Sequence, residues 1–196
     1  RGNAELADLA VKGAARLLIQ RAIDVLGGLD ILVANAGYAL KTPITEISDE
    51  DYETAHVTIA RSFFELATAA VPHLEKSNCG RIVGISAFGP HVWRTKVTPF
   101  AATAAAKASM EITAKALALR LAPSGITVNL IAPGFVRKDQ KAHVAISPEI
   151  LSKLVAEVPM GRVAEPEEIA SVVAFCASSE ASYITGQVIH VNGGLV

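Results

Sequence analysis

The chain alternates between short runs of apolar residues and longer segments in which apolar positions recur with helical spacing. Four runs are short and mostly apolar, which is typical of parallel strands buried on both faces, and they cover residues 29–34, 80–86, 126–131 and 187–191. The helical spacing predicts helices over residues 11–26, 48–76, 98–122, 148–157 and 166–177, and the second of these has one candidate break. Strands therefore alternate with helices along the chain.

This alternation predicts one α/β domain over residues 1–196, a Rossmann-type doubly wound parallel sheet in a three-layer α/β/α arrangement. Ligands of such sheets bind outside the carboxyl ends of the strands. Polar or turn-forming residues follow the predicted strands at residues 35–37, at Ser86 and at Pro133 and Gly134. We therefore expect these three segments to contribute to a single site.

Composition narrows the classes of function. Hydrophobic residues make up 51% of the chain, but no apolar run approaches the roughly 18 residues of a membrane-spanning helix. The formal net charge of −1 gives no indication of a nucleic-acid surface. The two cysteines lack metal-binding or redox spacing, the first residues carry no apolar signal-peptide segment, and the five histidines match no metal-ligand spacing. We expect a cytoplasmic protein with no membrane, nucleic-acid or metal partner.

Six short motifs then occur in the order and approximate spacing of one known family. They are Asn-Ala-Gly at 35–37, the strand at 80–86, Lys107, the segments 121–129 and 133–134, and the closing segment 185–194. On these motifs the chain resembles the short-chain dehydrogenase/reductases over essentially its whole length. The resemblance implies an oxidoreductase that uses NAD or NADP as its cofactor.

The resemblance also indicates which part of the family fold lies outside these 196 residues. The family's aspartate on the adenine side of the cofactor corresponds to Asp8, which Leu9 follows. Family members carry a Gly-rich turn before that aspartate, and its backbone N–H groups hold the pyrophosphate. We therefore expect the natural protein to extend by roughly 50 residues before Arg1. The residues that distinguish NAD from NADP would lie there, so the choice between the two stays open.

The family motifs imply a set of cofactor-binding residues at the strand ends. The expected set is Asp8, Leu9, Asn35, Ala36, Gly37, Ile85, Lys107, Pro133, Gly134 and Val136. The threonine that follows the Pro-Gly turn in the family is Lys138 here.

The catalytic positions depart from the family pattern. Lys107 matches the catalytic lysine, but Thr103 stands where the family has the tyrosine that donates the proton. Ala87 occupies the position of the catalytic serine, so Ser86 is either a cofactor-side contact or a displaced substitute. Thr58 occupies the position of the asparagine that supports a water relay. We predict Lys107, Thr103 and Ser86 as the catalytic candidates.

Two sub-families suggest other proton donors. Bacterial enoyl reductases resemble residues 106–111 and place their tyrosine earlier, where Phe100 stands. Dienoyl-thioester reductases have a small hydroxyl residue at the position of Thr103, and their donor is a tyrosine from the region where this chain has His91. His91 is either a titratable substitute for that tyrosine or an ordinary exposed loop histidine. Tyr38, directly after the Asn-Ala-Gly motif, is a further candidate, as a donor or as an aromatic lid.

These residues together predict reduction of a carbonyl or enoyl group on a small apolar substrate by a non-classical site. Tyr38, Trp93 and Phe135 would line the substrate pocket, and the segment 135–163 would close over it. The alternative is a catalytically silent scaffold that binds cofactor or only its own copies. Alanine-rich faces on the two long helices, at residues 67–70 and 104–108, suggest a homodimer or a homotetramer.

Overall fold

The computed structural model describes residues 2–95, 99–137 and 148–195 of the chain. Its four strands are parallel and lie in the order β1-β2-β3-β4. They are β1 (Ile31–Ala34), β2 (Arg81–Ile85), β3 (Thr127–Pro133) and β4 (Val188–Val191). The predicted α/β fold with a parallel sheet is confirmed, and each strand lies within or close to its predicted range.

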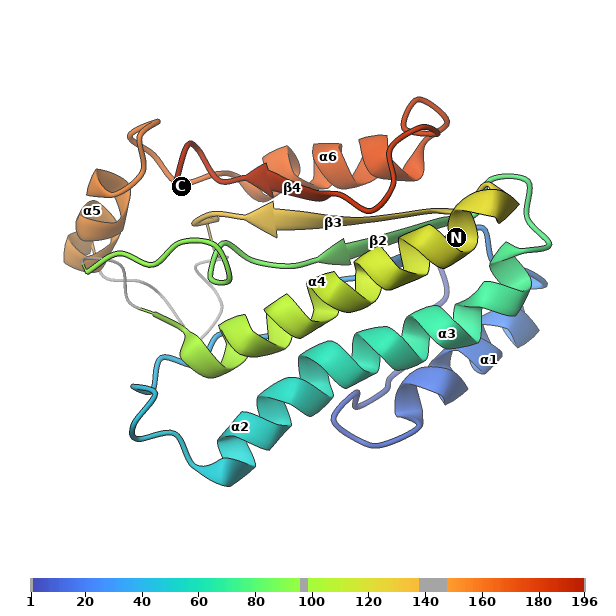
Figure 1. Ribbon diagram of the computed structural model, residues 1–196, viewed down its shortest axis with the longest axis horizontal. Coiled ribbons are helices and arrows are strands. Elements are labelled where there is room, and N and C mark those ends of the chain that lie inside the picture. The colour runs from blue at the N-terminus through green and yellow to red at the C-terminus, as the bar shows by residue number, and fades with distance from the viewer. Residues whose placement is uncertain (1, 96–98, 138–147, 196) are drawn as a thin grey trace.

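Helices cover both faces of this sheet, as Figure 1 shows. One face carries α3 (Ser62–Leu74) and α4 (Ala101–Leu121), with α1 (Ala14–Leu26) packed against α3. The other face carries α6 (Pro166–Ala177), which contacts β2 and β3. The remaining helical segments are α2 (Asp49–Ala55), the π-helix η1 (His56–Arg61), the 3₁₀ turn η2 (Ala122–Ser124) and α5 (Pro148–Ala156). The three-layer prediction is therefore confirmed.

The candidate break in the second predicted helix is a π-helical segment. Ser48 caps the start of α2 by accepting a hydrogen bond from the Asp51 N–H at 3.0 Å. The helix then continues without interruption through η1 into α3, and the Ser62 hydroxyl donates to the Thr58 carbonyl at 2.5 Å. Thr58, which the family resemblance singled out, therefore lies in the π-helix. Such π-helical turns occur frequently at functional sites.

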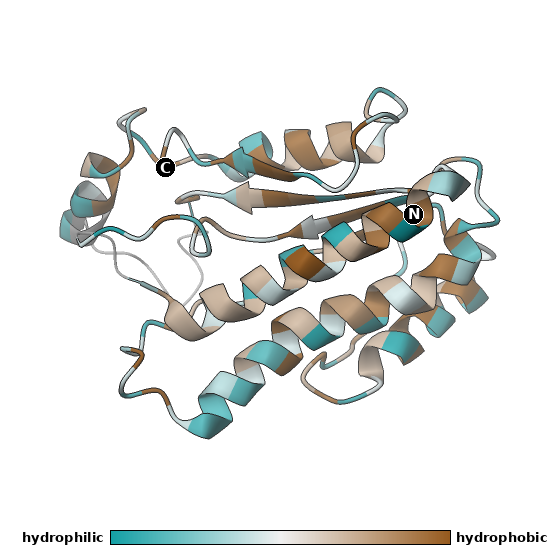
Figure 2. Cartoon of the chain, in the orientation of Figure 1, coloured by the Kyte–Doolittle hydropathy of each residue, from teal (hydrophilic) through white to brown (hydrophobic). Residues whose placement is uncertain are grey.

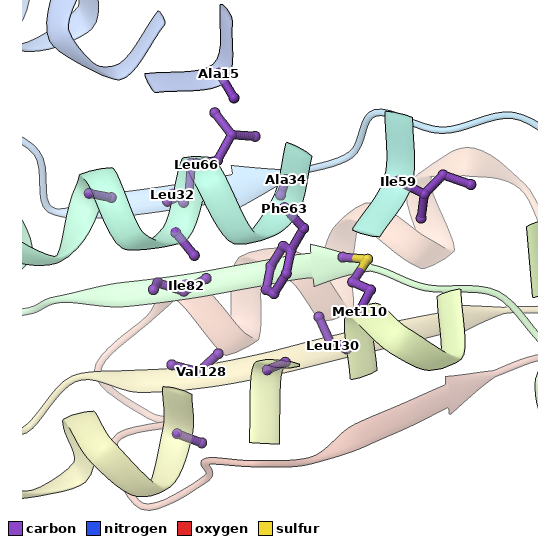
Figure 3. Close-up of a cluster of buried hydrophobic side chains, with 14 of the residues drawn as sticks. Ala15, Leu32, Ala34, Ile59, Phe63, Leu66, Ile82, Met110, Val128 and Leu130 are labelled. Carbon is purple, nitrogen blue, oxygen red and sulfur yellow. The ribbon is translucent and has the colours of Figure 1, made fainter. Parts of the chain in front are cut away.

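The main core lies between the sheet and the layer formed by α3 and α4. Phe63, Met110 and Leu130 meet there above β2, as Figure 3 shows. Gly84 of β2 makes this contact possible, because a Cβ atom at Gly84 would lie only 2.4 Å from Leu130 Cδ2 and 2.5 Å from Met110 Cε. Brown colouring in Figure 2 is prominent along the strands, and the helices carry both brown and teal residues.

The alanine-rich faces have a different role from the one that the sequence suggested. Ala67 and Ala70 of α3 and Ala104 and Ala106 of α4 are buried within the single chain. Their small side chains allow the helices to pack closely inside the chain, where α4 contacts both η1 and β3. The prediction that these faces provide a contact between copies was therefore wrong for these four residues.

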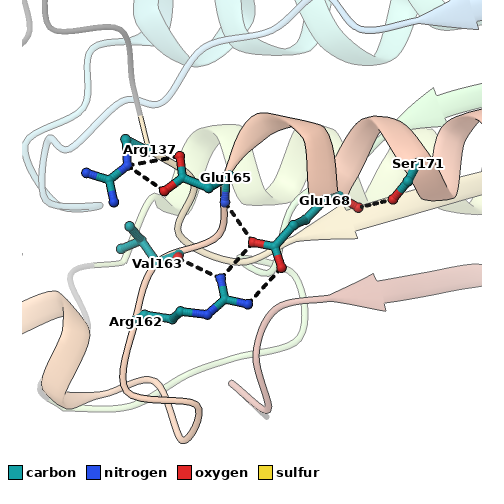
Figure 4. A network of polar contacts seen from close by, with 6 residues as sticks. All are labelled: Arg137, Arg162, Val163, Glu165, Glu168 and Ser171. Atoms are coloured by element: carbon teal, nitrogen blue, oxygen red, sulfur yellow. Dashed lines mark hydrogen bonds and ion pairs between the residues drawn. The ribbon is translucent and has the colours of Figure 1, made fainter.

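A polar network fixes the loop that leads into α6 (Figure 4). Arg162 donates to both carboxylate oxygens of Glu168 at 2.7 Å, and Glu168 also accepts from the Glu165 N–H at 2.9 Å. These hydrogen bonds lower the pKa of Glu168 to about 2. Arg137 binds the Glu165 carboxylate in turn, at 2.7 and 3.0 Å. The network thereby holds the segment after β3 against the start of α6.

Within the described part of the chain, no helix is both long enough and apolar enough to cross a membrane. Three predictions fall on residues outside the described ranges: the start of the third long helix at residue 98, Lys138, and residues 139–147 of the segment 135–163 that we expected to close over the pocket.

Candidate active site

The carboxyl ends of the strands bring the predicted polar segments to one edge of the sheet. Residues 35–37 follow β1, Ser86 follows β2 and Gly134 follows β3. The strands are parallel, and their last paired residues are Ala34 with Gly84 and Ile85 with Ile131. The three segments therefore begin side by side, and α4 passes beside them with Lys107 in its second turn.

Lys107 occupies the centre of this edge. Its side chain is buried, with 7% of the residue exposed, and its Nζ donates a hydrogen bond to the Ile85 carbonyl at the end of β2. A Cβ atom at Gly37 would lie 3.2 Å from Lys107 Nζ, so the amine also borders the Asn-Ala-Gly turn. The structure thus brings together three of the residues predicted to bind the cofactor, namely Gly37, Ile85 and Lys107.

Burial changes the acid–base behaviour of this amine. Desolvation lowers the pKa of Lys107 from 10.5 to about 8, while the nearby Glu111 carboxylate opposes that change. An ammonium group with a pKa near 8 is largely protonated at neutral pH and still gives up its proton readily. Lys107 can therefore act as an acid in addition to acting as a hydrogen-bond donor.

Thr103 lies one turn before Lys107 and is also buried, with 4% exposed. Its hydroxyl donates to the Phe100 carbonyl at 3.1 Å, so the hydroxyl proton points into the first turn of α4. This arrangement supports a role in starting the helix and gives no support to proton donation by Thr103.

Ser86 is turned toward α4. Its hydroxyl donates to Glu111 Oε1, and the His91 Nε2 also contacts that oxygen, at 3.0 Å. The predicted use of Ser86 as a substrate-binding hydroxyl is not what the structure favours, because this buried group already serves a carboxylate inside the chain. Sequence reasoning did not single out Glu111. Its spacing of four residues from Lys107 was the available signal, since such residues share a helix face.

The predicted pocket residues are only partly assembled. Phe135 packs edge-on against Phe88 with ring centroids 4.9 Å apart, and Phe88 in turn contacts Phe100. Trp93 is 64% exposed and its indole N–H donates to the Pro90 carbonyl at 3.4 Å. Tyr38 is 41% exposed, and burial together with the Asp51 charge raises its phenol pKa. Phe135 is therefore the predicted pocket residue that joins an aromatic cluster.

The other predicted cofactor contacts border the same edge or an exposed turn. Asn35 and Ala36 are exposed. The Asp8 carboxylate accepts a hydrogen bond from the Ala10 N–H at 2.9 Å and so caps its own turn, and Leu9 packs against the main core.

The segment after β3 carries the remaining predicted contacts. Pro133 ends β3 and pairs with Val191. Gly134 approaches Asn192 so closely that a Cβ atom would lie 2.7 Å from the Asn192 Cα. Val136 forms an isolated bridge with Ala164, which anchors the segment that carries Phe135.

The residues at this edge fit a polar ligand such as part of a dinucleotide. The buried amine offers a charged donor, and Gly37 leaves open the space beside that amine that a side chain would fill. Within the described ranges, no group of three or more His, Cys, Asp or Glu side chains is arranged to hold a metal ion.

A parallel sheet with helices on both faces is of the Rossmann type, in which ligands bind outside the carboxyl ends of the strands, and the buried Lys107 lies at that edge. A family model described as enoyl-(acyl carrier protein) reductase matches residues 4–196. The chain belongs to the short-chain dehydrogenase/reductase family, as its sequence predicted, and the members of that family are oxidoreductases.

Individual relatives and structures agree with this assignment. A 3-oxoacyl-[acyl-carrier-protein] reductase of Salmonella typhimurium is 41% identical over 169 residues, which are 86% of this chain and 67% of that protein. The protein of the same description from Rickettsia conorii is 36% identical over 98% of this chain and 76% of its own length. A crystal structure of a putative short-chain alcohol dehydrogenase from Sinorhizobium meliloti superposes with a TM-score of 0.90 at 30% identity, over 100% of this chain and 76% of that one.

Proposed function

We propose that the protein is an NAD(P)H-dependent reductase that acts on the 3-keto group of an acyl thioester through a non-classical site. The observation that carries this proposal is the buried Lys107 amine, which lies between Ile85 and Gly37 at the carboxyl ends of the strands. Two relatives are 3-oxoacyl-[acyl-carrier-protein] reductases, and this favours a 3-oxoacyl group on a thioester as the substrate. We also expect the protein to act in the cytoplasm.

Lys107 would supply the proton for the reaction. An NAD(P)H bound at this edge would supply the hydride to the keto carbon and leave as NAD(P)+, and Lys107 Nζ would give a proton to the substrate oxygen, so that the product would be a hydroxyl group and the neutral amine would regain its proton from water. The pKa of Lys107 near 8 matches this role, because an effective acid titrates close to the working pH.

Restoring the family's tyrosine tests whether proton donation limits the rate of this site. We expect Thr103→Tyr to increase kcat for a 3-oxoacyl thioester by at least about tenfold, because a positioned general acid is worth about 10²–10⁴ in rate. The measurement combines calorimetric titration with NADH and NADPH and a steady-state screen of ketone, enoyl and dienoyl substrates. Thr103→Phe is the matched control, because it adds the ring without the hydroxyl and should not accelerate the reaction.

A catalytically silent scaffold is the second candidate. It is favoured by the internal use of the Thr103 and Ser86 hydroxyls, which leaves both groups committed to protein partners. Cofactor binding without turnover, with activity appearing only in Thr103→Tyr, would support the silent scaffold. If neither NADH nor NADPH binds, the reductase proposal fails.

We further propose that copies of the chain pair through the outer faces of α3 and α4 into a homodimer or a homotetramer. Phe64 on α3 and Ile112 and Leu119 on α4 are large apolar side chains that stay 46%, 66% and 82% exposed. Ile112 and Leu119 are seven residues apart and so share one helix face. We expect sedimentation velocity to give a multiple of 20.5 kDa, and we expect Leu119→Glu to reduce it. A monomer at all concentrations would contradict this proposal.

A further inference from the structure

Glu111 is a buried carboxylate to which the mechanism above assigns no role. Only 5% of the residue is exposed, and it lies on the sheet-facing side of α4 directly after the turn that holds Lys107. Taking a carboxylate out of water is costly unless charges or hydrogen bonds compensate for the loss. Its partners should therefore indicate why the chain retains it.

The groups around Glu111 come from the end of β2, the loop after it, β4 and α4 itself. The Ser86 hydroxyl at the end of β2 and the His91 Nε2 in the following loop both donate to Glu111 Oε1. The His190 ring on β4 packs against the His91 ring at 4.5 Å between centroids and 77° between planes. Lys107 lies one helical turn earlier on α4 and interacts with the Glu111 charge. Among the described residues, Lys107, His91 and His190 are titratable groups that interact with Glu111.

We propose that Glu111 is a positioning residue of the reductase site: its carboxylate, held by Ser86 and His91, keeps the Lys107 amine in its protonated form. The inference rests on the proposed role of Lys107 as proton donor. It also gives the buried Ser86 hydroxyl a role, since Ser86 donates to the carboxylate and orients it.

The electrostatics of the cluster favour this role. Burial alone would make the Lys107 amine neutral more easily, and Glu111 is the group that acts in the opposite direction on its pKa. His190 does not compete for the carboxylate as a cation near neutrality, because burial and the neighbouring His91 lower the His190 pKa from 6.5. His91 contacts the carboxylate directly, with Nε2 at 3.0 Å from Glu111 Oε1, whereas Lys107 lies one helical turn away on α4 and shares the same charge.

The test measures the ionisation of Lys107 without requiring turnover. In Glu111→Gln, we expect the titration midpoint of the Lys107 side chain, followed by NMR and assigned with a Lys107→Met sample, to fall by about 1 pH unit or more. The basic limb of the kcat profile should move with it, so kcat above about pH 9 should drop about tenfold while KM for the cofactor changes little.

Three further variants make the result decisive. Glu111→Asp keeps a carboxylate, so its Lys107 midpoint should stay close to that of the parent. Glu111→Met removes the charge, so its midpoint should fall as in Glu111→Gln, and it replaces that variant if the glutamine protein folds poorly. Glu65→Gln removes another buried carboxylate, which binds Gly13 N–H and lies near Arg61, and should leave the midpoint unchanged. An unchanged midpoint in both Glu111→Gln and Glu111→Met would overturn the inference. A lowered midpoint in a protein that reduces no thioester would uphold it for the amine while refuting the reductase proposal.

Discussion

Replacing Lys107 with methionine is expected to reduce kcat/KM for a 3-oxoacyl thioester by about 10³ or more, since losing a positioned acid alone costs about 10²–10⁴. The variant also loses a charged hydrogen-bond donor at the edge where Gly37 and Ile85 meet, so we expect weaker NAD(P)H binding as well. Methionine is close to lysine in length and is apolar, so it can fill the same buried volume. Steady-state kinetics and fluorescence titration with NADPH would measure the two losses separately.

Lys115→Met provides the matched control for this experiment. Lys115 lies on the same helix, eight residues further along, but is exposed to solvent. Its replacement removes one positive charge without touching the carboxyl edge of the sheet, and activity should stay close to that of the parent. If Lys107→Met retained parental turnover, the proton would have to come from another group, and Tyr38 beside Gly37 would become the first candidate.

The fold could be predicted because its signals are local. Four apolar runs separated by helical patterns define a parallel sheet, and the last helix, α6, begins at Pro166 as predicted. The π-helical form of residues 56–61 could not be predicted in the same way. It depends on how His56–Arg61 packs against α4, which is a contact between residues far apart in the chain.

One part of the site could be predicted from the order of the elements, and another part could not. Gly37, Ile85 and Lys107 meet because parallel strands end at one edge of the sheet, a consequence of topology that the order of elements already contained. The partner of Ser86 was not predictable, because it depends on the side-chain direction at the end of β2. Ile82, Gly84 and Ser86 alternate onto the face covered by α4, which brings the Ser86 hydroxyl to Glu111.

The core contact over β2 leads to the largest expected effect on stability. We expect Gly84→Val to lower the free energy of unfolding by about 3 kcal/mol, the upper end of the usual range for overpacking a core. Even a single Cβ atom at Gly84 would lie 2.4 Å from Leu130 Cδ2 and 2.5 Å from Met110 Cε, and valine adds two methyl groups beyond it. Figure 3 shows Met110, Leu130 and Phe63 gathered above this strand, and the Met110 and Leu130 side chains are both buried in the core.

Urea denaturation, followed by circular dichroism, would measure this loss as a lower midpoint with an unchanged slope. Gly28→Val is the control, because a Cβ atom at Gly28 would meet nothing within 4 Å and surface substitutions of this kind usually change stability by less than about 0.5 kcal/mol. Native domains are stable by only about 5–15 kcal/mol, so a loss of about 3 kcal/mol would be clearly visible in the unfolding curve. Equal midpoints for the two variants would mean that the Met110 and Leu130 side chains move aside at little cost, and that the close packing of α4 over β2 does not limit the residue at position 84.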